Sequence, residues 1–178
     1  MKLVYDEIET PVGPILLAAG ESGVYALEFD FDPEQALRRL ERRFDRVELR
    51  RQSNPSGYSD RLRGYFAGDL QALDEIAVDT GGTEFQHRVW MELRNIPVGS
   101  TCSYADLARA VGRPSATRAV GAANGRNPVS VILPCHRVIG ADGSLTGYGG
   151  GLERKRWLLA HEGVAVASEG NSRFAWSS

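Results

Sequence analysis

The alternation of apolar and polar residues in the first half of the chain predicts a small sheet with helices. Short apolar segments separated by turn-forming residues are typical of strands, and four such segments are present: 4–8, 15–19, 24–29 and 47–49. Asp32 precedes Pro33 and Gln35, which is typical of a helix N-terminus, and apolar residues follow at helical spacing. A second helix is expected around 59–66. We therefore predict an α+β unit with an antiparallel sheet.

In the second half of the chain, apolar residues recur at the spacing of helices. Thr83 with Gln86 and Ser103 with Asp106 have the spacing of capping boxes, and each pair precedes apolar residues at helical spacing. Ser115 follows a short glycine-containing turn and is expected to cap a third helix. Helix, short turn and helix is the helix-turn-helix pattern. Helices also pair in this way without binding DNA, so the pattern alone leaves DNA binding open.

Turn-forming residues at 79–82 mark a predicted domain boundary. We expect an N-terminal α+β domain at 1–82, a C-terminal helix-turn-helix domain at 83–167 and a flexible tail at 168–178. The net charge of −2 conceals an asymmetry between these parts. Residues 1–82 carry 10 Lys and Arg against 16 Asp and Glu, whereas residues 83–156 carry 10 against 5. A basic segment permits local phosphate binding, although a solvated mixed-charge surface would have the same composition.

The remaining composition indicates an intracellular protein. No apolar run approaches the roughly 18 residues of a membrane-spanning helix, and the first residues lack the basic-then-apolar order of a signal peptide. Cys102 and Cys135 are the two cysteines, too few for a disulfide framework. We expect a cytoplasmic location, no membrane partner and reduced thiols.

Cys135 is the strongest candidate for chemistry. It lies in Pro134-Cys-His-Arg-Val138, directly after the apolar run 129–133. A small buried cysteine is the ordinary alternative. A nucleophilic cysteine needs a nearby base or cation that favours the thiolate, and His136 is adjacent. Because adjacent side chains on an extended segment point in opposite directions, their contact would require a bridging water or a turn.

The sequence from Phe85 to Gly163 resembles the O6-alkylguanine-DNA alkyltransferases. The shared motifs are Ser103-Tyr104, Arg118-Ala-Val-Gly121, Asn127-Pro128, Pro134-Cys-His-Arg-Val138, Gly147-Tyr148, Gly150-Gly151 and His161-Glu-Gly163. The resemblance implies a ribonuclease-H-like N-terminal domain and a mostly helical, winged-helix-like C-terminal domain that holds the reactive cysteine. It also implies duplex DNA containing O6-alkylguanine as the partner, and single-turnover transfer of the alkyl group to the protein.

The resemblance assigns roles to individual residues. It implies that Cys135 accepts the alkyl group, that His136 acts as a base through water, and that Glu162 orients His136. A thiolate suits displacement at an alkyl carbon, and the departing oxygen needs a hydrogen bond or a proton. The other implied site residues are Tyr104 at the base, Lys155 as its polarising partner, Asn127 as a brace, and Val138, Tyr148 and Gly149 lining the pocket. Asn127 in a simple turn and Lys155 in solvent remain alternatives.

Arg118 resembles an arginine that enters the minor groove and fills the space of an extruded base. Small neighbours would allow close approach to the groove, although a packed helix pair uses the same residues. The predicted DNA contacts are Arg118, Ala116, Thr117, Ala119, Arg126 and Arg137, with Arg109 and Arg113 as further phosphate candidates. Surface salt bridges are the alternative for these arginines.

Two other classes of function remain open at this point. A cysteine hydrolase also combines Cys, His and an acid, but it would turn over and would not need Arg118. A non-catalytic DNA-binding module could use the same helices. We expect no cofactor and no metal, because the His and Cys spacing does not match a zinc site. We expect a monomer. The sequence does not distinguish methyl from bulkier alkyl groups, or establish activity on O4-alkylthymine.

Overall fold

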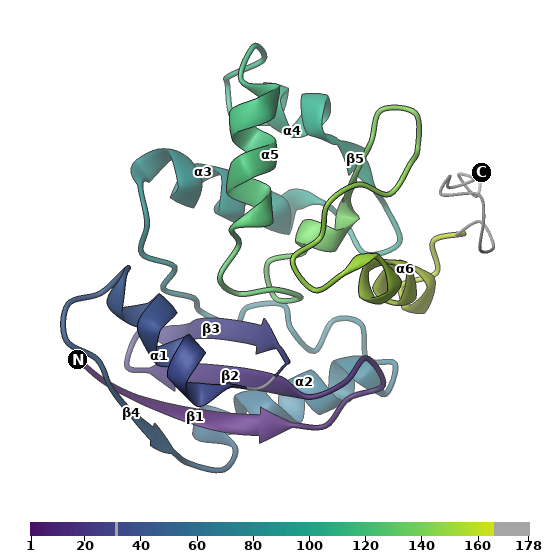
Figure 1. Cartoon of the computed structure of the whole chain (residues 1–178). Coiled ribbons are helices and arrows are strands. Elements are labelled where there is room, and N and C mark those ends of the chain that lie inside the picture. The colour runs from purple at the N-terminus through teal and green to yellow at the C-terminus, as the bar shows by residue number, and fades with distance from the viewer. Residues whose placement is uncertain (31, 166–178) are drawn as a thin grey trace. The chain divides into compact units, whose positions relative to one another are not determined.

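The computed structural model describes residues 1–30 and 32–165. The tail predicted at 168–178 lies outside the described residues. The chain divides into two compact units, which are described separately (Figure 1). The first comprises Met1–Gly82 together with Pro128–Ile132, and the second comprises Thr83–Asn127 and the chain from Leu133 onward.

The first unit is built on a four-stranded sheet with the order β3-β2-β1-β4. Its strands are β1 (Lys2–Ile8), β2 (Ile15–Gly20), β3 (Gly23–Phe29) and β4 (Glu48–Arg51). The pairs β1–β2 and β2–β3 are antiparallel, as the sequence predicts. β4 instead pairs with β1 in parallel, so the prediction of a wholly antiparallel sheet is wrong. Helix α1 (Pro33–Glu41) connects β3 to β4, and a helical crossover returns the chain in the direction of the strand before it.

The two faces of β1 pack against different helices. Leu3 and Tyr5 belong to the apolar cluster under α1, whereas Asp6 faces the loop and helix that follow β4. That helix is α2 (Tyr58–Phe66), which is preceded by a 3₁₀ turn, η1 (Pro55–Gly57). The buried Asp6 carboxylate accepts hydrogen bonds from Ser59 Oγ at 2.7 Å and from the Asn54 backbone at 2.9 Å. It therefore holds this segment against the sheet.

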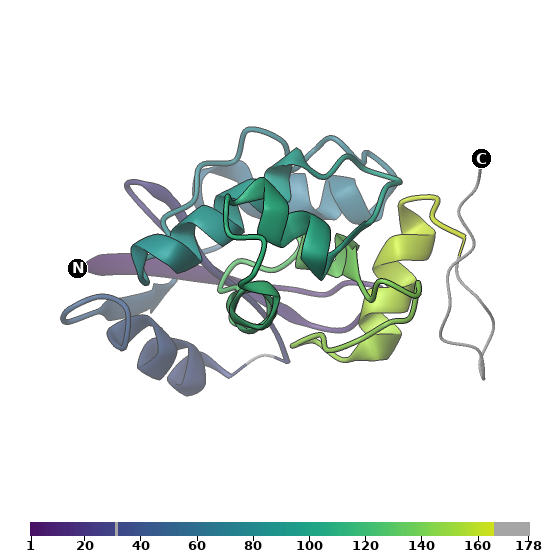
Figure 2. The same ribbon diagram turned by 90° about the horizontal axis from the view of Figure 1, so that it is seen from above.

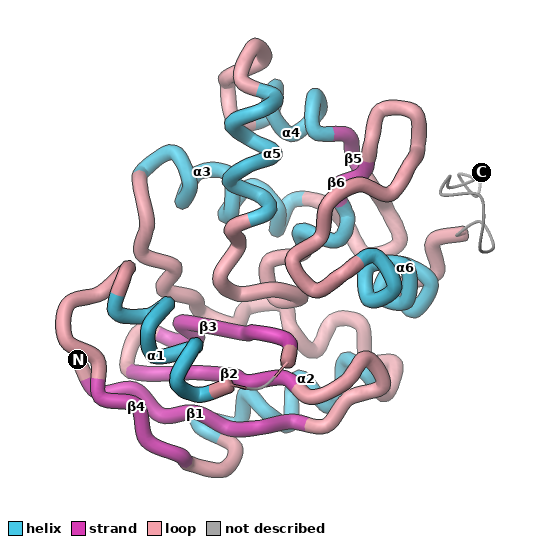
Figure 3. Tube along the Cα trace, viewed as in Figure 1, coloured by secondary structure: helices cyan, strands magenta, loops and turns pink. Residues whose placement is uncertain are grey.

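The second unit is mostly helical (Figure 3). Helices α3 (Glu84–Glu92), α4 (Tyr104–Ala110) and α5 (Thr117–Gly125) contact one another pairwise, and the 3₁₀ turn η2 (Leu93–Asn95) follows α3. Trp90 Nε1 donates to the Ala123 carbonyl at 2.8 Å, which fastens α3 to the last turn of α5. Figure 2 shows α5 nearly along its axis.

Local capping signals predicted most helix starts. Asp32 caps α1, and the capping boxes Thr83–Gln86 and Ser103–Asp106 are both formed. The expected cap at Ser115 is wrong, because α5 begins two residues later and its N-cap, Ala116, has no side-chain hydrogen bond. The backbone N–H groups that begin α5 are therefore not capped by a side chain at that position.

The segment that contains Cys135 forms a short turn in the second unit. The 3₁₀ turn η3 (Cys135–Arg137) is followed by β6 (Val138–Ile139), which pairs in parallel with β5 (Cys102–Ser103), and α6 (Leu152–His161) comes last. These two-residue strands are too short for an apolar pattern to predict.

Within the first unit, the segment Pro128–Ile132 pairs with β3 through a bridge between Leu27 and Val129. Among the described residues, no helix has the length and apolar character needed to cross a bilayer.

Candidate active site

Cys135 is buried at the start of a tight turn in the second unit. The residue is 4% exposed, and its N–H donates to the Leu133 carbonyl at 2.8 Å. The backbone turns at Pro134 into η3, so the turn that the sequence left open as one possibility is present. This turn changes the directions of successive side chains and places His136 in the interior.

His136 is fully buried and paired with Glu162. Its Nε2 lies 2.9 Å from Glu162 Oε1, and Glu162 is itself the C-cap residue of α6. With the Nε2 proton directed at the carboxylate, Nδ1 is left as the unprotonated ring nitrogen. Nδ1 is buried and has no hydrogen-bond partner in the described part of the chain. It is therefore available to accept a proton.

Burial and neighbouring charges favour a neutral His136. Burial lowers the pKa of His136, the Glu162 charge opposes that shift, and the charges of Arg137 and Lys155 reinforce it. Burial alone would raise the pKa of Glu162. The hydrogen bonds from His136 and Arg137, together with the positive charge of Arg137, outweigh burial and lower the pKa of Glu162 far below its ordinary value. The pair is thus a neutral imidazole against a carboxylate.

Arg137 does not occupy the position predicted for a DNA contact. It is buried, its Nε and Nη2 bind the two oxygens of Glu162 at 2.9 Å each, and Nη1 donates to the Ile96 carbonyl at 2.6 Å. All three guanidinium nitrogens are occupied inside the unit, so a phosphate cannot reach them. The predicted DNA contact at Arg137 is therefore wrong.

Tyr104 and Lys155 meet at the backbone of Thr146. The Tyr104 hydroxyl donates to the Thr146 carbonyl at 3.3 Å and lies 3.4 Å from Thr146 Oγ1. Lys155 Nζ donates to the same carbonyl at 2.9 Å and to the Val138 carbonyl at 2.6 Å. Lys155 thus reaches Tyr104 through a shared carbonyl, and the alternative of a solvated Lys155 is excluded because the residue is buried.

The same surroundings set the charge states of these two groups. Burial is the main reason that the pKa of Tyr104 is raised, so its hydroxyl keeps its proton. Burial also lowers the pKa of Lys155 to about 8, against the opposing charge of Cys135. A cation held by two carbonyls next to a phenol polarises the shared peptide group.

Two asparagines hold the backbone on either side of the thiol. Asn127 Nδ2 donates to the Leu133 carbonyl at 2.7 Å, which is the bracing contact expected for this residue. Asn124 Nδ2 lies 3.5 Å from the Cys135 carbonyl. Sequence reasoning missed Asn124, although its position on the buried face of α5 beside Ala123 could have identified it. It also missed Thr146, whose contribution through a backbone carbonyl leaves no residue-type signal.

The remaining predicted pocket residues lie on the segment around η3 and before α6. Val138 follows the reactive turn, and its carbonyl is bound by Lys155. Tyr148 is half-buried and Gly149 is exposed. A Cβ added at Gly149 would have its nearest neighbour 3.9 Å away, at the Gly125 carbonyl, so a side chain could be accommodated there without a clash.

Helix α5 presents a face of small residues with an arginine near each end. Arg118 and Arg126 are exposed, Ala119 and Ala122 between them are exposed, and Ala116 and Thr117 are half-buried. Val120 is buried toward the other helices. The exposed face therefore has little side-chain bulk, as close approach to a groove requires.

Arg109, a further phosphate candidate, is ion-paired with Asp106 on α4, whereas Arg113 is exposed in the turn before α5. The ion-pair alternative thus holds for Arg109. No group of three His, Cys, Asp or Glu side chains within residues 1–30 and 32–165 is arranged to hold a metal ion.

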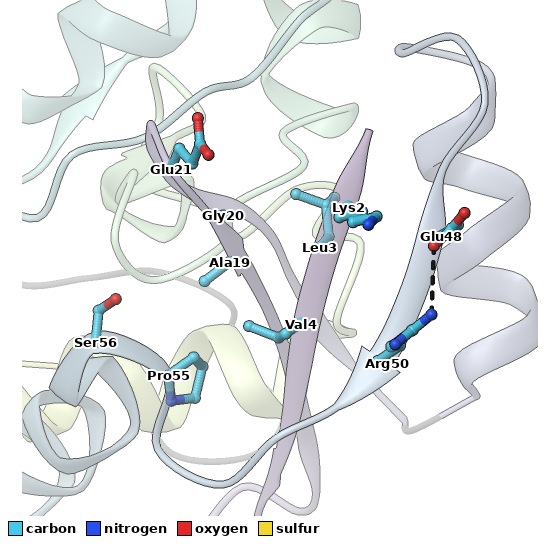
Figure 4. A pocket seen from close by; sticks show the side chains of 10 residues that line it. All are labelled: Lys2, Leu3, Val4, Ala19, Gly20, Glu21, Glu48, Arg50, Pro55 and Ser56. Atoms are coloured by element: carbon cyan, nitrogen blue, oxygen red, sulfur yellow. Dashed lines mark ion pairs between the residues drawn. The ribbon is translucent and has the colours of Figure 1, made fainter.

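A separate hollow of about 390 Å³ lies in the first unit, beside β1 and β4 (Figure 4). The hollow is lined by Lys2, Glu21 and an Arg50–Glu48 ion pair, so it is bordered by both cations and carboxylates. None of the predicted site residues borders it. Because its charged side chains face solvent and its cations are matched by acids, it lacks the features of a built ligand site.

Two family models cover most of the chain. The model described as "6-O-methylguanine DNA methyltransferase, ribonuclease-like domain" matches residues 3–80, and the model described as "6-O-methylguanine DNA methyltransferase, DNA binding domain" matches residues 84–164. A methylated-DNA–protein-cysteine methyltransferase of Shigella flexneri is 47% identical over 169 residues, which are 93% of this chain and 99% of that protein. A protein of the same name from Mycobacterium bovis is 46% identical over 161 residues, or 89% and 91% of the two chains.

Solved structures agree with this similarity. A crystal structure of Mycobacterium tuberculosis O6-methylguanine methyltransferase superposes with a TM-score of 0.76 at 43% identity, covering 90% of this chain and 92% of that one. A structure of Mycobacterium tuberculosis OGT in complex with DNA gives a TM-score of 0.75 at 42% identity, covering 91% and 92%.

Proposed function

The chain belongs to the 6-O-methylguanine DNA methyltransferase family, and on that basis we propose that it binds duplex DNA, extrudes O6-alkylguanine and transfers the alkyl group irreversibly to Cys135. The observation that carries the assignment of Cys135 is its burial in η3 next to the His136–Glu162 pair. A relative solved with DNA supports duplex DNA as the partner. The predicted domains at 1–82 and 83–167, a monomeric state and a cytoplasmic location are part of the same proposal.

The transfer is a single displacement. The Cys135 thiol gives its proton to His136 Nδ1 through a water, and the thiolate attacks the alkyl carbon. The sulfur–carbon bond forms as the carbon–O6 bond breaks, and the bonding electron pair moves onto the guanine. The guanine takes up one proton as it departs, and His136 passes the thiol proton on to water. The proton lost by the thiol and the proton gained by the guanine therefore balance, and His136 is neutral again. The thioether product is not readily hydrolysed, which makes the reaction single-turnover.

Each neighbouring group has a part in this step. Glu162 fixes the His136 ring by accepting the Nε2 proton at 2.9 Å, which leaves Nδ1 unprotonated in the neutral imidazole. Tyr104 is a protonated hydroxyl donor for the departing guanine, and Lys155 polarises the carbonyl that Tyr104 contacts. Asn127 holds the backbone before the cysteine. Val138, Tyr148 and Gly149 line the base pocket in this proposal.

The exposed face of α5 is proposed to carry the DNA contacts. Arg118 enters the base stack, the small residues Ala116, Thr117 and Ala119 allow the helix to approach the minor groove, and Arg126 contacts a phosphate. Extrusion is required because the alkyl group lies within the stack, where a buried thiol cannot reach it.

A titration with damaged DNA tests this function. Increasing amounts of duplex containing O6-methylguanine are mixed with a fixed amount of protein, and the repaired guanine is counted. Repair should stop at one guanine per protein molecule. A cysteine hydrolase would continue to turn over, and a non-catalytic DNA-binding module would leave the alkylguanine unchanged; either result would overturn the proposal.

A further inference from the structure

Arg137 is placed to act on the reaction from inside the protein. Its guanidinium is buried and grips both oxygens of Glu162, and Glu162 Oε1 is shared between Arg137 Nη2 and His136 Nε2, each at 2.9 Å. We propose that Arg137 is a positioning residue that keeps His136 neutral, so that Nδ1 can accept the thiol proton across the physiological pH range. The inference rests on the proposed function, because it assigns His136 as the base.

The charge of Arg137 reduces the tendency of the Glu162 carboxylate to attract a proton onto the His136 imidazole. A buried carboxylate with no other cation attracts a proton onto its histidine, because an ion pair is better solvated inside a protein than a lone charge. With Arg137 in place, the carboxylate already has its counter-ion. A second cation on His136 would leave an excess positive charge in the interior.

Among the other charged groups around His136, Lys155 opposes protonation of the ring as Arg137 does, whereas Glu162 and the thiolate form of Cys135 favour it. Lys155, on α6, is buried and adds to the positive field at the ring. Cys135 adjoins His136 in η3, and its negative form is the product of the proton transfer that the site performs. Glu162 favours protonation, and Arg137 and Lys155 oppose it.

The unpartnered Nδ1 is an independent sign of the neutral form. Protonation of His136 would put an N–H donor at Nδ1, where no acceptor is present in the described part of the chain. A buried donor without an acceptor is unfavourable, whereas an unprotonated Nδ1 can receive a hydrogen bond from a water. The fork of Arg137 on Glu162 also fixes the carboxylate plane that orients the ring.

Two substitutions separate the charge of Arg137 from its shape. Arg137→Gln removes the charge and retains a donor, whereas Arg137→Lys retains the charge and loses the fork. Arg88→Gln, at an exposed position on α3, is the matched control. Transfer from free O6-benzylguanine is followed in single-turnover experiments between about pH 5.5 and 9, so that DNA binding does not enter the measured rate.

In the pH–rate profile of Arg137→Gln, we expect the acidic limb to move to higher pH by about 1–2 units. This is the usual effect of removing one nearby charge. Its rate at high pH should return to within about threefold of wild type. Arg137→Lys and Arg88→Gln should keep the wild-type limb. A purely structural role would instead lower the Arg137→Gln rate by the same factor at every pH, and that result would overturn the proposal.

A titration of the His136 ring by nuclear magnetic resonance tests the proposal without depending on either Arg137 variant. In the wild-type protein the ring should remain neutral, with its proton on Nε2, below the ordinary histidine pKa of about 6.5. A ring that takes up its second proton above that value would refute the proposal. Benzyl transfer by the wild type separates failure of the Arg137 proposal from failure of the proposed function. A wild-type protein that alkylates Cys135 retains its proposed function even if Arg137 proves to be only structural.

Discussion

Arg118→Ala is expected to impair reaction with duplex DNA while leaving the chemistry at Cys135 intact. Arg118 is exposed on α5, whereas the contacts that hold the backbone around Cys135 come from the buried Asn124 and the half-buried Asn127. An exposed helix position tolerates alanine with little change in stability, within about 0.5 kcal/mol. The substitution therefore removes the side chain proposed to fill the space of the flipped base, without weakening the fold.

The magnitude follows from the cost of extrusion. Unstacking a base requires a few kcal/mol, and loss of about 2–3 kcal/mol of compensation lowers the duplex rate by about 30–150-fold. Free O6-benzylguanine needs no extrusion, so its rate should stay close to that of wild type. Single-turnover rates for the two substrates, measured at saturating DNA, give the comparison.

Arg126→Ala is the matched control, because Arg126 is exposed at the other end of α5. Its loss should weaken binding to damaged and undamaged duplexes alike and reduce the salt slope by about 1, with little effect on the rate at saturation. Equal losses on duplex and free base in Arg118→Ala would mean that Arg118 supports the fold or the pocket. That outcome would refute an extrusion role.

Three further substitutions test the site and the first unit. Tyr104→Phe should slow transfer by about 10²-fold with little change in melting temperature, because it removes the hydroxyl donor and keeps the ring; an unchanged single-turnover rate would exclude the donor role. Lys155→Met should slow transfer and also lower the free energy of unfolding by about 1–3 kcal/mol, since the carbonyls of Val138 and Thr146 lose their buried donor; denaturant unfolding would show this loss, and unchanged stability would contradict the contacts. Burial raises the pKa of Asp6, but its hydrogen bonds outweigh burial and lower it overall, so Asp6 stabilises the fold above its unfolded pKa of about 3.9 and this stabilisation is lost on further acidification. Asp6→Asn should therefore lower the melting temperature at pH 7 more than at pH 3, and a deficit that does not shrink with acid would contradict the assignment.

The parts of the fold that depend on residues close together in the sequence were predictable from it. The Thr83–Gln86 and Ser103–Asp106 pairs satisfy backbone groups within one helical turn, so their spacing is sufficient evidence for a helix start. The parallel pairing of β4 depends on the path of the chain through α1, which no residue pattern in β4 records.

The same distinction applies to the site. The motif around Cys135 identified the reactive segment, but an extended segment and a 3₁₀ turn give His136 different directions, and the sequence did not distinguish them. Arg137 was predicted to contact DNA, which would place it at the surface, where most arginines lie. Its burial depends on Glu162 and on the Ile96 carbonyl, 25 and 41 residues away in the chain, so only the folded structure reveals it.

Intact-mass measurement tests irreversible transfer to Cys135 most directly. The protein is mixed with an excess of duplex containing O6-methylguanine, and its mass is followed until it no longer changes, after which the modified residue is located by peptide mapping. One methyl group should be added per molecule, it should lie on Cys135, and Cys135→Ala should gain none. A protein that repairs more than one equivalent of DNA while keeping its original mass, or a Cys135→Ala variant that still repairs, would contradict the account.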